Sequence, residues 1–160
     1  MILSEEQIMI RDMARDFADN ELTPHAAEWD RNATLPIEVL HQMGSLGLMG
    51  MTIPEEWGGA GTDYVSYALA LMEIARGDGA VSTIMSVTNS PTLSCILNAG
   101  TEKQKEDFLK PLARGEIFGA FCLTEPGAGS DASNLKTRAV KSDKGWLING
   151  SKMFISNGKI

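Results

Sequence analysis

Apolar residues recur every three to four positions near the start of the chain, which predicts an amphipathic helix. Ser4 and Gln7 precede this run at the spacing of a capping box, in which each side chain binds the other residue's backbone N–H. We therefore expect the first helix to begin just after Ser4. The apolar positions are Ile10, Met13, Ala14, Phe17 and Ala18.

Proline, glycine and a second capping box divide the next hundred residues into further helices. Pro24 is expected to interrupt the first helix, and Pro91 to kink or break a long, almost uncharged one. Residues 52–62 are rich in turn formers and predict a loop. The predicted helices are a short one through Trp29, one over 37–46, two over 63–76 and 80–98, and one that opens at the Thr101–Gln104 box and ends near Arg114.

The hydrophobic period changes from helical to alternating near residue 116. Asn149-Gly150 separates two of the later runs, and this dipeptide favours hairpin turns because both residues tolerate positive φ. The predicted fold class is α+β: an all-α helical domain over 1–116, then the first strands of an antiparallel β-domain over 117–160. Strands are expected over 117–123, 137–141, 146–148 and 151–155.

The predicted β-domain is incomplete. About forty residues of sheet cannot close a core or cover their own edges. Either a partner completes the sheet or the chain is the opening part of a longer protein, and we favour the second explanation.

Composition narrows the function classes. Hydrophobic residues make up 43% and charged residues 22%, as in ordinary globular proteins. The net charge of −7 disfavours nucleic-acid binding. No apolar run approaches the length of about 20 residues that spans a bilayer, and the first residues lack the features of a signal peptide.

Two cysteines and two histidines limit the redox and metal chemistry. We expect Cys95 and Cys122 to be buried, unpaired thiols, which favours a reducing, cytoplasmic location. His25 and His41 offer no zinc-ligand spacing, so we expect no metal site.

Charge is uneven along the chain. Residues 1–30 carry eight acidic and two basic side chains, whereas residues 131–160 carry six basic and two acidic ones. Both segments can be solvated faces. Alternatively, the basic end faces an anionic ligand or an acidic neighbouring subunit.

The most distinctive stretch is Thr124–Ala132, which is rich in glycine and small residues. It matches a relaxed dinucleotide fingerprint, but strands rather than a helix are expected after it, so a Rossmann domain is disfavoured. Small residues let backbone N–H groups approach a phosphate, and the Thr124 and Ser130 hydroxyls add polar contacts. Phe121 and Leu123 could present an apolar face to a flat ring. A purely structural loop explains the composition equally well.

This stretch resembles the flavin signature of the acyl-CoA dehydrogenases. Residues 54–59, 100–105 and 148–157 are similar to three further motifs of that family, in the same order and spacing, so the resemblance covers the whole chain. It implies FAD as cofactor, an acyl-CoA substrate, electron-transfer flavoprotein as acceptor, and a homotetramer or homodimer. In the family, FAD lies between the β-domain and C-terminal helices, with a neighbouring subunit contributing.

The resemblance also assigns cofactor residues. Phe154 stands where the family more often has Trp and so lacks the indole N–H, whereas Ser156 replaces the commoner Thr and keeps a hydroxyl. Both would stand against the flavin near its reactive nitrogen. The flavin ring would be lined by Phe121, Leu123 and Thr124, and the pyrophosphate would meet Gly129 and Ser130.

Substrate contacts follow from the same resemblance. Ser130 would also lie near the acyl-CoA, and Thr83, Ile84 and Val87 would face the acyl pocket, unless they are plain core residues. Similarity to short-chain members points to a small acyl group. The family's catalytic base lies beyond Ile160, so no catalytic residue is assigned, and Glu125 is expected to orient its loop.

Two other functions remain open at this point. A stand-alone, non-catalytic module could bind acyl-CoA or a protein partner, although its strand edges would need cover. A related flavin oxidase or monooxygenase could use the same scaffold.

Overall fold

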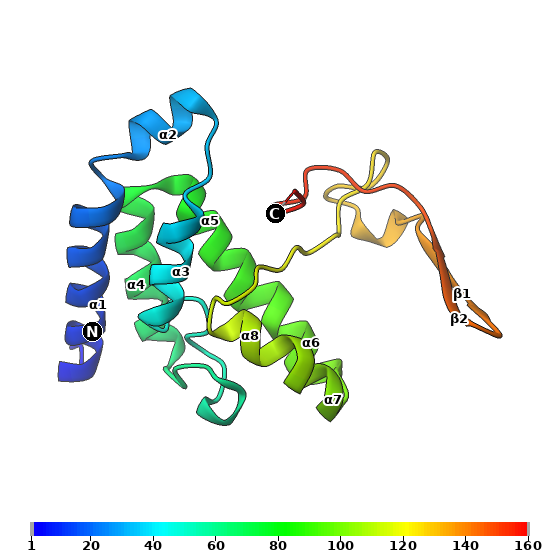
Figure 1. Ribbon diagram of the computed structural model, residues 1–160, viewed down its shortest axis with the longest axis horizontal. Helices are drawn as coiled ribbons and strands as arrows, with labels where there is room; N and C mark the ends of the chain where they lie inside the picture. Colours follow the sequence, from blue (N-terminus) through cyan, green and yellow to red (C-terminus); the bar gives the residue numbers. More distant parts are fainter. Residues whose placement is uncertain (1, 160) are drawn as a thin grey trace. The chain divides into compact units, whose positions relative to one another are not determined.

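The computed structural model describes residues 2–159. The chain divides into two compact units, a helical unit that runs to Gly119 and a hairpin unit that begins at Ala120. Figure 1 shows the helices of the first and the two strands of the second. The α+β fold class expected from the sequence is confirmed.

The helical unit contains eight α-helices among the described residues, several joined by single wider turns. The wider turns are π-helical and cover Ala18–Leu22, Thr88–Thr92 and Lys105–Leu109. The helices are α1 Glu5–Phe17, α2 Ala26–Asn32, α3 Ile37–Ser45, α4 Tyr64–Gly77, α5 Gly79–Val87, α6 Leu93–Ala99, α7 Glu102–Gln104 and α8 Lys110–Ala113.

Local signals in the sequence place the helix ends. The Ser4 side chain accepts a hydrogen bond from the Gln7 N–H, and Thr101 does the same for Gln104, so both capping boxes are confirmed. Pro91 lies inside the π-helical turn between α5 and α6, because it has no N–H to donate to the preceding turn. The predicted break of the 80–98 helix is therefore also confirmed.

Two apolar cores hold the helical unit together. The larger one forms where α1, α3, α4 and α5 pack together, and the smaller one joins Ile53 to Leu93, Leu109 and Leu112. Burying each large aliphatic side chain contributes about 1.5–3 kcal/mol. The largest fully buried members of the first core are Leu22, Leu40, Met43, Leu48, Met49, Ile74 and Met85.

The hairpin unit contains β1 Arg138–Ser142 and β2 Gly145–Asn149, paired antiparallel. Arg138 pairs with Asn149, and Ser142 pairs with Gly145, whose φ of +124° closes the turn. Every residue of both strands is exposed. The strands therefore present apolar side chains, such as Trp146 and Ile148, that nothing in this unit covers.

Two predicted strands are wrong. Residues 117–123 form no strand, because Phe118 packs on the helical core and the division between the units follows Gly119. Residues 151–155 also form none, so Asn149-Gly150 does not close a hairpin, whereas the strands expected at 137–141 and 146–148 do form, with the turn between them at 142–145. A strand requires a ladder of backbone hydrogen bonds to a neighbouring segment, and the bond from the Met153 N–H to the Thr124 carbonyl does not make a ladder for 151–155.

The cysteine expectation is half right. Cys95 and Cys122 are unpaired, but both are exposed rather than buried. Apolar neighbours in the sequence did not indicate burial here, because Cys95 lies on an outward part of α6 and Cys122 lies in an extended segment. No helix within residues 2–159 is both long enough and apolar enough to cross a membrane.

Candidate functional site

The hairpin unit brings two sequence motifs side by side. Lys152 donates from Nζ to the Leu123 carbonyl oxygen at 2.8 Å and to Glu125 Oε1 at 2.9 Å. The Met153 N–H donates to the Thr124 carbonyl oxygen at 3.0 Å. Leu123 and the first two residues of the glycine-rich stretch are thus bonded to Lys152 and Met153 of the C-terminal motif, although more than 25 positions separate them in the chain.

Glu125 anchors the glycine-rich loop. Its residue is only 6% exposed, and its carboxylate accepts the backbone N–H groups of Lys136 at 2.7 Å and Thr137 at 2.9 Å. Hydrogen bonding from Thr137, the Lys136 N–H and Lys152, in that order, lowers the pKa of Glu125 to about 2. A carboxylate with so low a pKa is a weak base, and both of its oxygens already accept hydrogen bonds, so it is poorly suited to remove a proton near neutral pH. The orienting role expected for Glu125 agrees with these contacts.

The loop after Glu125 is a tight turn with an exposed backbone. Glu125 and Ala128 exchange two backbone hydrogen bonds of 3.0 and 3.1 Å. A Cβ added at Gly127 or Gly129 would meet no atom within 4 Å among the described residues. Packing inside this unit therefore does not require either glycine. Their absence of side chains instead leaves backbone N–H groups open to a ligand such as a phosphate.

Three large apolar side chains beside this loop lack cover. Phe121 is 36% exposed, Leu123 41% and Phe154 85%. Phe154 also has a φ of +55°, in the left-handed region that aromatic residues rarely adopt. Strained, exposed positions of this kind gather at ligand-binding sites. An exposed ring held in an unfavourable conformation fits a site that a flat ligand completes.

Three hydroxyls of the two motifs are available to a ligand. The side chains of Thr124, Ser130 and Ser156 have no hydrogen-bond partner among residues 2–159. A flavin dinucleotide combines a polar, flat ring with a pyrophosphate. The free hydroxyls and open glycine backbone can donate hydrogen bonds to such a ligand, and the uncovered apolar side chains can pack on its ring. The residues present therefore fit FAD.

The substrate residues expected on α5 lie in different environments. Ile84 is 6% exposed and belongs to the larger core. Thr83 is exposed, and its hydroxyl donates to the Gly79 carbonyl oxygen at 2.9 Å, while Val87 is half-buried. Ile84 thus matches the alternative expectation of a core residue, and Thr83 and Val87 are the two with accessible atoms.

Other features of the described residues do not add to this site. A cavity of about 520 Å³ lies between α2 and the junction of α4 with α5, and none of the expected site residues lines it. No cluster of three His, Cys, Asp or Glu side chains in the described part of the chain could hold a metal ion.

Sequence reasoning assigned no role to Lys152. The sequence offered one indication of its role, which is that Lys152 in the C-terminal motif and Glu125 in the glycine-rich stretch carry opposite charges. That signal has no meaning until the fold brings the motifs together, because the two residues lie 27 positions apart.

Two family models match the chain. The acyl-CoA dehydrogenase N-terminal domain matches residues 4–116, and the acyl-CoA dehydrogenase middle domain matches residues 120–160. Together they cover the helical unit and the hairpin unit in chain order.

Individual relatives agree with these models. An acyl-CoA dehydrogenase of Bacillus subtilis is 47% identical over 158 residues, which is 99% of this chain and 42% of the relative. The short-chain specific acyl-CoA dehydrogenase of Clostridium acetobutylicum is 44% identical with the same coverage. The chain therefore spans about two-fifths of the length of these relatives.

A solved structure shows the same fold. The glutaryl-CoA dehydrogenase of Mycobacterium smegmatis in complex with FADH2 superposes with a TM-score of 0.92 at 39% identity, over 96% of this chain and 39% of that one.

Proposed function

This chain belongs to the acyl-CoA dehydrogenase family, and on that premise we propose that it provides part of an enzyme that oxidises an acyl-CoA thioester at its α and β carbons with FAD. We assign residues 1–116 to the family's helical N-terminal domain and residues 117–160 to the beginning of its middle β-domain. The observation that carries the proposal is the hydrogen-bonded pairing of two motifs that leave their hydroxyls and rings uncovered.

The flavin ring is assigned to the two paired motifs. Thr124 supplies a hydroxyl to its polar edge, and Ser156 a second one near the reactive nitrogen. Phe154 packs on the ring, and its exposed side chain supports this role. Further apolar contact comes from Phe121 and Leu123.

The glycine-rich turn is assigned to the pyrophosphate. Open space around Gly129 supports a close approach of phosphate oxygens to the backbone. Ser130, next to it, donates from its hydroxyl and also contacts the acyl-CoA.

The acyl group is assigned to α5. Thr83 and Val87 have accessible atoms there, and Ile84 contributes from the core side. A small acyl group is favoured, because a relative with 44% identity is specific for short chains. We further propose electron-transfer flavoprotein as the acceptor and a homotetramer or homodimer as the assembly.

The chemistry requires a base, an acceptor and a stabilised enolate. A carboxylate removes the weakly acidic α-proton while hydrogen bonds to the thioester carbonyl hold the developing negative charge. When bound, FAD supplies the acceptor for the β-hydrogen, which leaves as hydride. Glu125 is not proposed as the base, since its carboxylate already accepts three hydrogen bonds, and no other residue of this chain is assigned that role. The residues of this chain bind and orient the reacting groups.

Flavin spectroscopy tests this proposal. The protein, purified as its host produces it, should carry FAD, and butyryl-CoA added without oxygen should bleach its absorbance near 450 nm within a stoichiometric titration. Absence of flavin, or flavin that acyl-CoA leaves oxidised, would contradict the proposal. Rapid reoxidation by oxygen would instead favour a flavin oxidase on the same scaffold.

A further inference from the structure

One ammonium group links the two candidate flavin loops. Lys152 Nζ lies within hydrogen-bond distance of the Leu123 carbonyl and of the Glu125 carboxylate. Its side chain is 21% exposed and that of Glu125 is 5% exposed, so the contact is largely shielded from water. Charge-assisted hydrogen bonds are about twice as strong as neutral ones, and shielding preserves that strength.

This contact surrounds Thr124. Lys152 holds the residue before it and the residue after it, while the Met153 N–H holds the Thr124 carbonyl itself. The C-terminal motif therefore holds three successive residues, Leu123 and Thr124 through their backbone carbonyls and Glu125 through its side chain. Since χ1 of a threonine is restricted by its backbone conformation, holding the backbone also limits the directions of its hydroxyl.

The same contact constrains Phe154. Only Met153 separates it from Lys152, and its φ of +55° must be maintained by the surrounding structure. Its ring is 85% exposed and gains little packing from the described residues. The bonds of Lys152 and Met153 help to hold this part of the chain.

Glu125 does not depend on Lys152 for its own position. The N–H groups of Lys136 and Thr137, at the entry to β1, hold its carboxylate independently. Removal of the lysine should leave Glu125 anchored to β1, with the Met153 N–H bond as the remaining link between Thr124 and the C-terminal motif.

We propose that Lys152 is a positioning residue of the flavin site, which holds Thr124 and Phe154 in the register that the isoalloxazine ring requires. This role rests on the proposed function. Lys152 touches neither reacting atom in this account, and it acts through the two residues that do contact the ring.

Substitution in the complete, flavin-binding protein tests this role. Lys152→Met removes both side-chain bonds with little loss of volume, and it should weaken FAD binding about tenfold and shift the visible bands of the bound flavin toward those of free FAD. Lys152→Arg keeps the charge and should restore the affinity to within about threefold, but with shifted bands, because a planar guanidinium cannot reproduce both bonds. Lys103→Met is the control, since it removes an ammonium that is 82% exposed and pairs with Asp107 on α7 and the following turn, and it should bind FAD like the wild type.

The results distinguish a positioning role for Lys152 from a purely structural one. Wild-type affinity and an unchanged flavin spectrum in Lys152→Met would overturn the positioning role, even if its melting temperature falls, because a purely structural lysine predicts that combination. If Lys152→Met does not fold, the spectrum of Lys152→Arg decides, and unchanged bands overturn the role. A wild-type protein without flavin would instead overturn the proposed function, and the role of Lys152 with it.

Discussion

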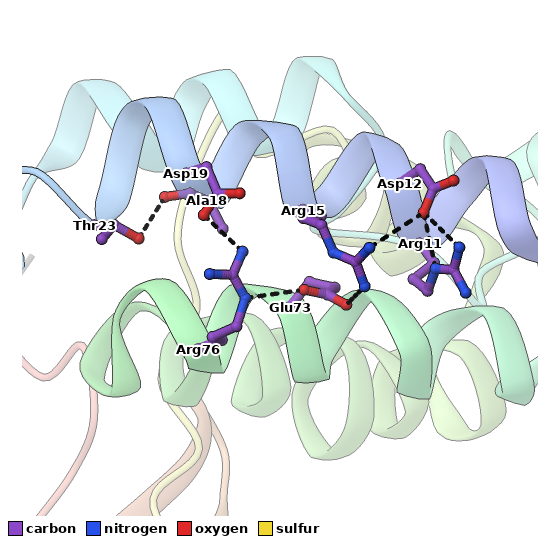
Figure 2. Close-up of polar contacts among 8 residues, drawn as sticks. All are labelled: Arg11, Asp12, Arg15, Ala18, Asp19, Thr23, Glu73 and Arg76. Atoms are coloured by element: carbon purple, nitrogen blue, oxygen red, sulfur yellow. Dashed lines mark hydrogen bonds and ion pairs between the residues drawn. The ribbon is translucent and has the colours of Figure 1, made fainter.

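Arg15 in α1 donates from Nη2 to Glu73 Oε1 in α4 at 2.6 Å. Figure 2 shows Glu73 between two guanidinium groups, with Arg76 at 3.1 Å from its other oxygen. Arg76 in turn reaches Asp19 at 2.7 Å. Because Glu73 is 9% exposed while both arginines are about half exposed, the carboxylate is the member of this network whose removal costs most.

Replacement of Glu73 by Gln should therefore destabilise the helical unit. The hydrogen bond from Arg15 lowers the pKa of Glu73, which shows that the ionised form is favoured in the fold. We expect a loss of about 1–2 kcal/mol in the free energy of unfolding, measured in urea, since solvent screens the two arginines. The matched control Glu106→Gln removes an exposed partner of Lys110 and should cost less than about 0.5 kcal/mol. Equal losses in the two variants would contradict the account.

Replacement of Asn89 should lower the free energy of unfolding more than replacement of Glu73. Its side chain is 1% exposed, accepts from the Met51 N–H at 2.7 Å, and donates to the carbonyl oxygens of Leu48 at 2.8 Å and Met85 at 3.0 Å. Asn89→Ala leaves the buried Met51 N–H and Leu48 carbonyl without these partners, while the Met85 carbonyl still accepts the Thr88 N–H, so we expect a loss of about 3 kcal/mol in urea unfolding.

A matched asparagine provides the control for that variant. Asn98 donates to the Ser94 carbonyl at the same i−4 spacing but is exposed. Asn98→Ala should change stability by less than about 0.5 kcal/mol. A loss below about 1 kcal/mol for Asn89→Ala would show that water replaces its bonds.

Acid should loosen the hairpin unit through Glu125. The pKa of this group falls from 4.5 to about 2 in the fold, so the folded chain binds this proton less tightly than the unfolded chain. Its contribution to stability is complete above pH 4.5 and is lost as the pH falls toward about 2. The protection factors of the Lys136 and Thr137 amides, whose N–H groups bind the carboxylate, should fall in this window once exchange is corrected for its intrinsic dependence on pH. Glu125→Gln should abolish the acid dependence at these two amides, and its persistence would assign the effect to another group.

Replacement of Phe154 should weaken FAD binding without lowering the stability of the flavin-free protein. Asn tolerates the left-handed region better than an aromatic residue does. Phe154→Asn should therefore leave the flavin-free protein as stable as the wild type or up to about 1 kcal/mol more stable, yet bind FAD about tenfold more weakly. Phe108, which is 51% exposed in the helical unit, is the control. Phe108→Asn should leave FAD affinity unchanged, and a clear loss of stability in Phe154→Asn would remove the strain argument.

The helix ends of this protein were predictable because their causes are local. Capping boxes need only residues three positions apart, as in Ser4 and Gln7. A proline such as Pro91 removes its own N–H wherever the chain goes. The predicted α+β class follows from the same local periodicity.

Features that depend on distant partners were not predictable. The strand predicted at 117–123 does not form, because Phe118 packs against the helical core rather than beside another strand. Gly44 lies inside α3, where a Cβ would collide with the backbone of Arg114 and Gly115. No short-range pattern identifies such a contact across 70 positions.

The candidate site divides in the same way. Its glycine-rich loop could be recognised from residues 124–132 alone, whereas the bonds from Lys152 to that loop required the fold. The assignment of Phe154 to a flat ligand came from resemblance, and its exposure and backbone conformation supply an independent physical reason.

A crystal structure of the flavin-loaded protein tests the central claim most directly. We predict that the Thr124 hydroxyl lies at about 3 Å from a polar atom of the isoalloxazine ring, that Phe154 packs on the ring, and that the Lys152 bonds to Leu123 and Glu125 persist. A flavin bound elsewhere, with Thr124 and Phe154 still facing solvent, would contradict the account.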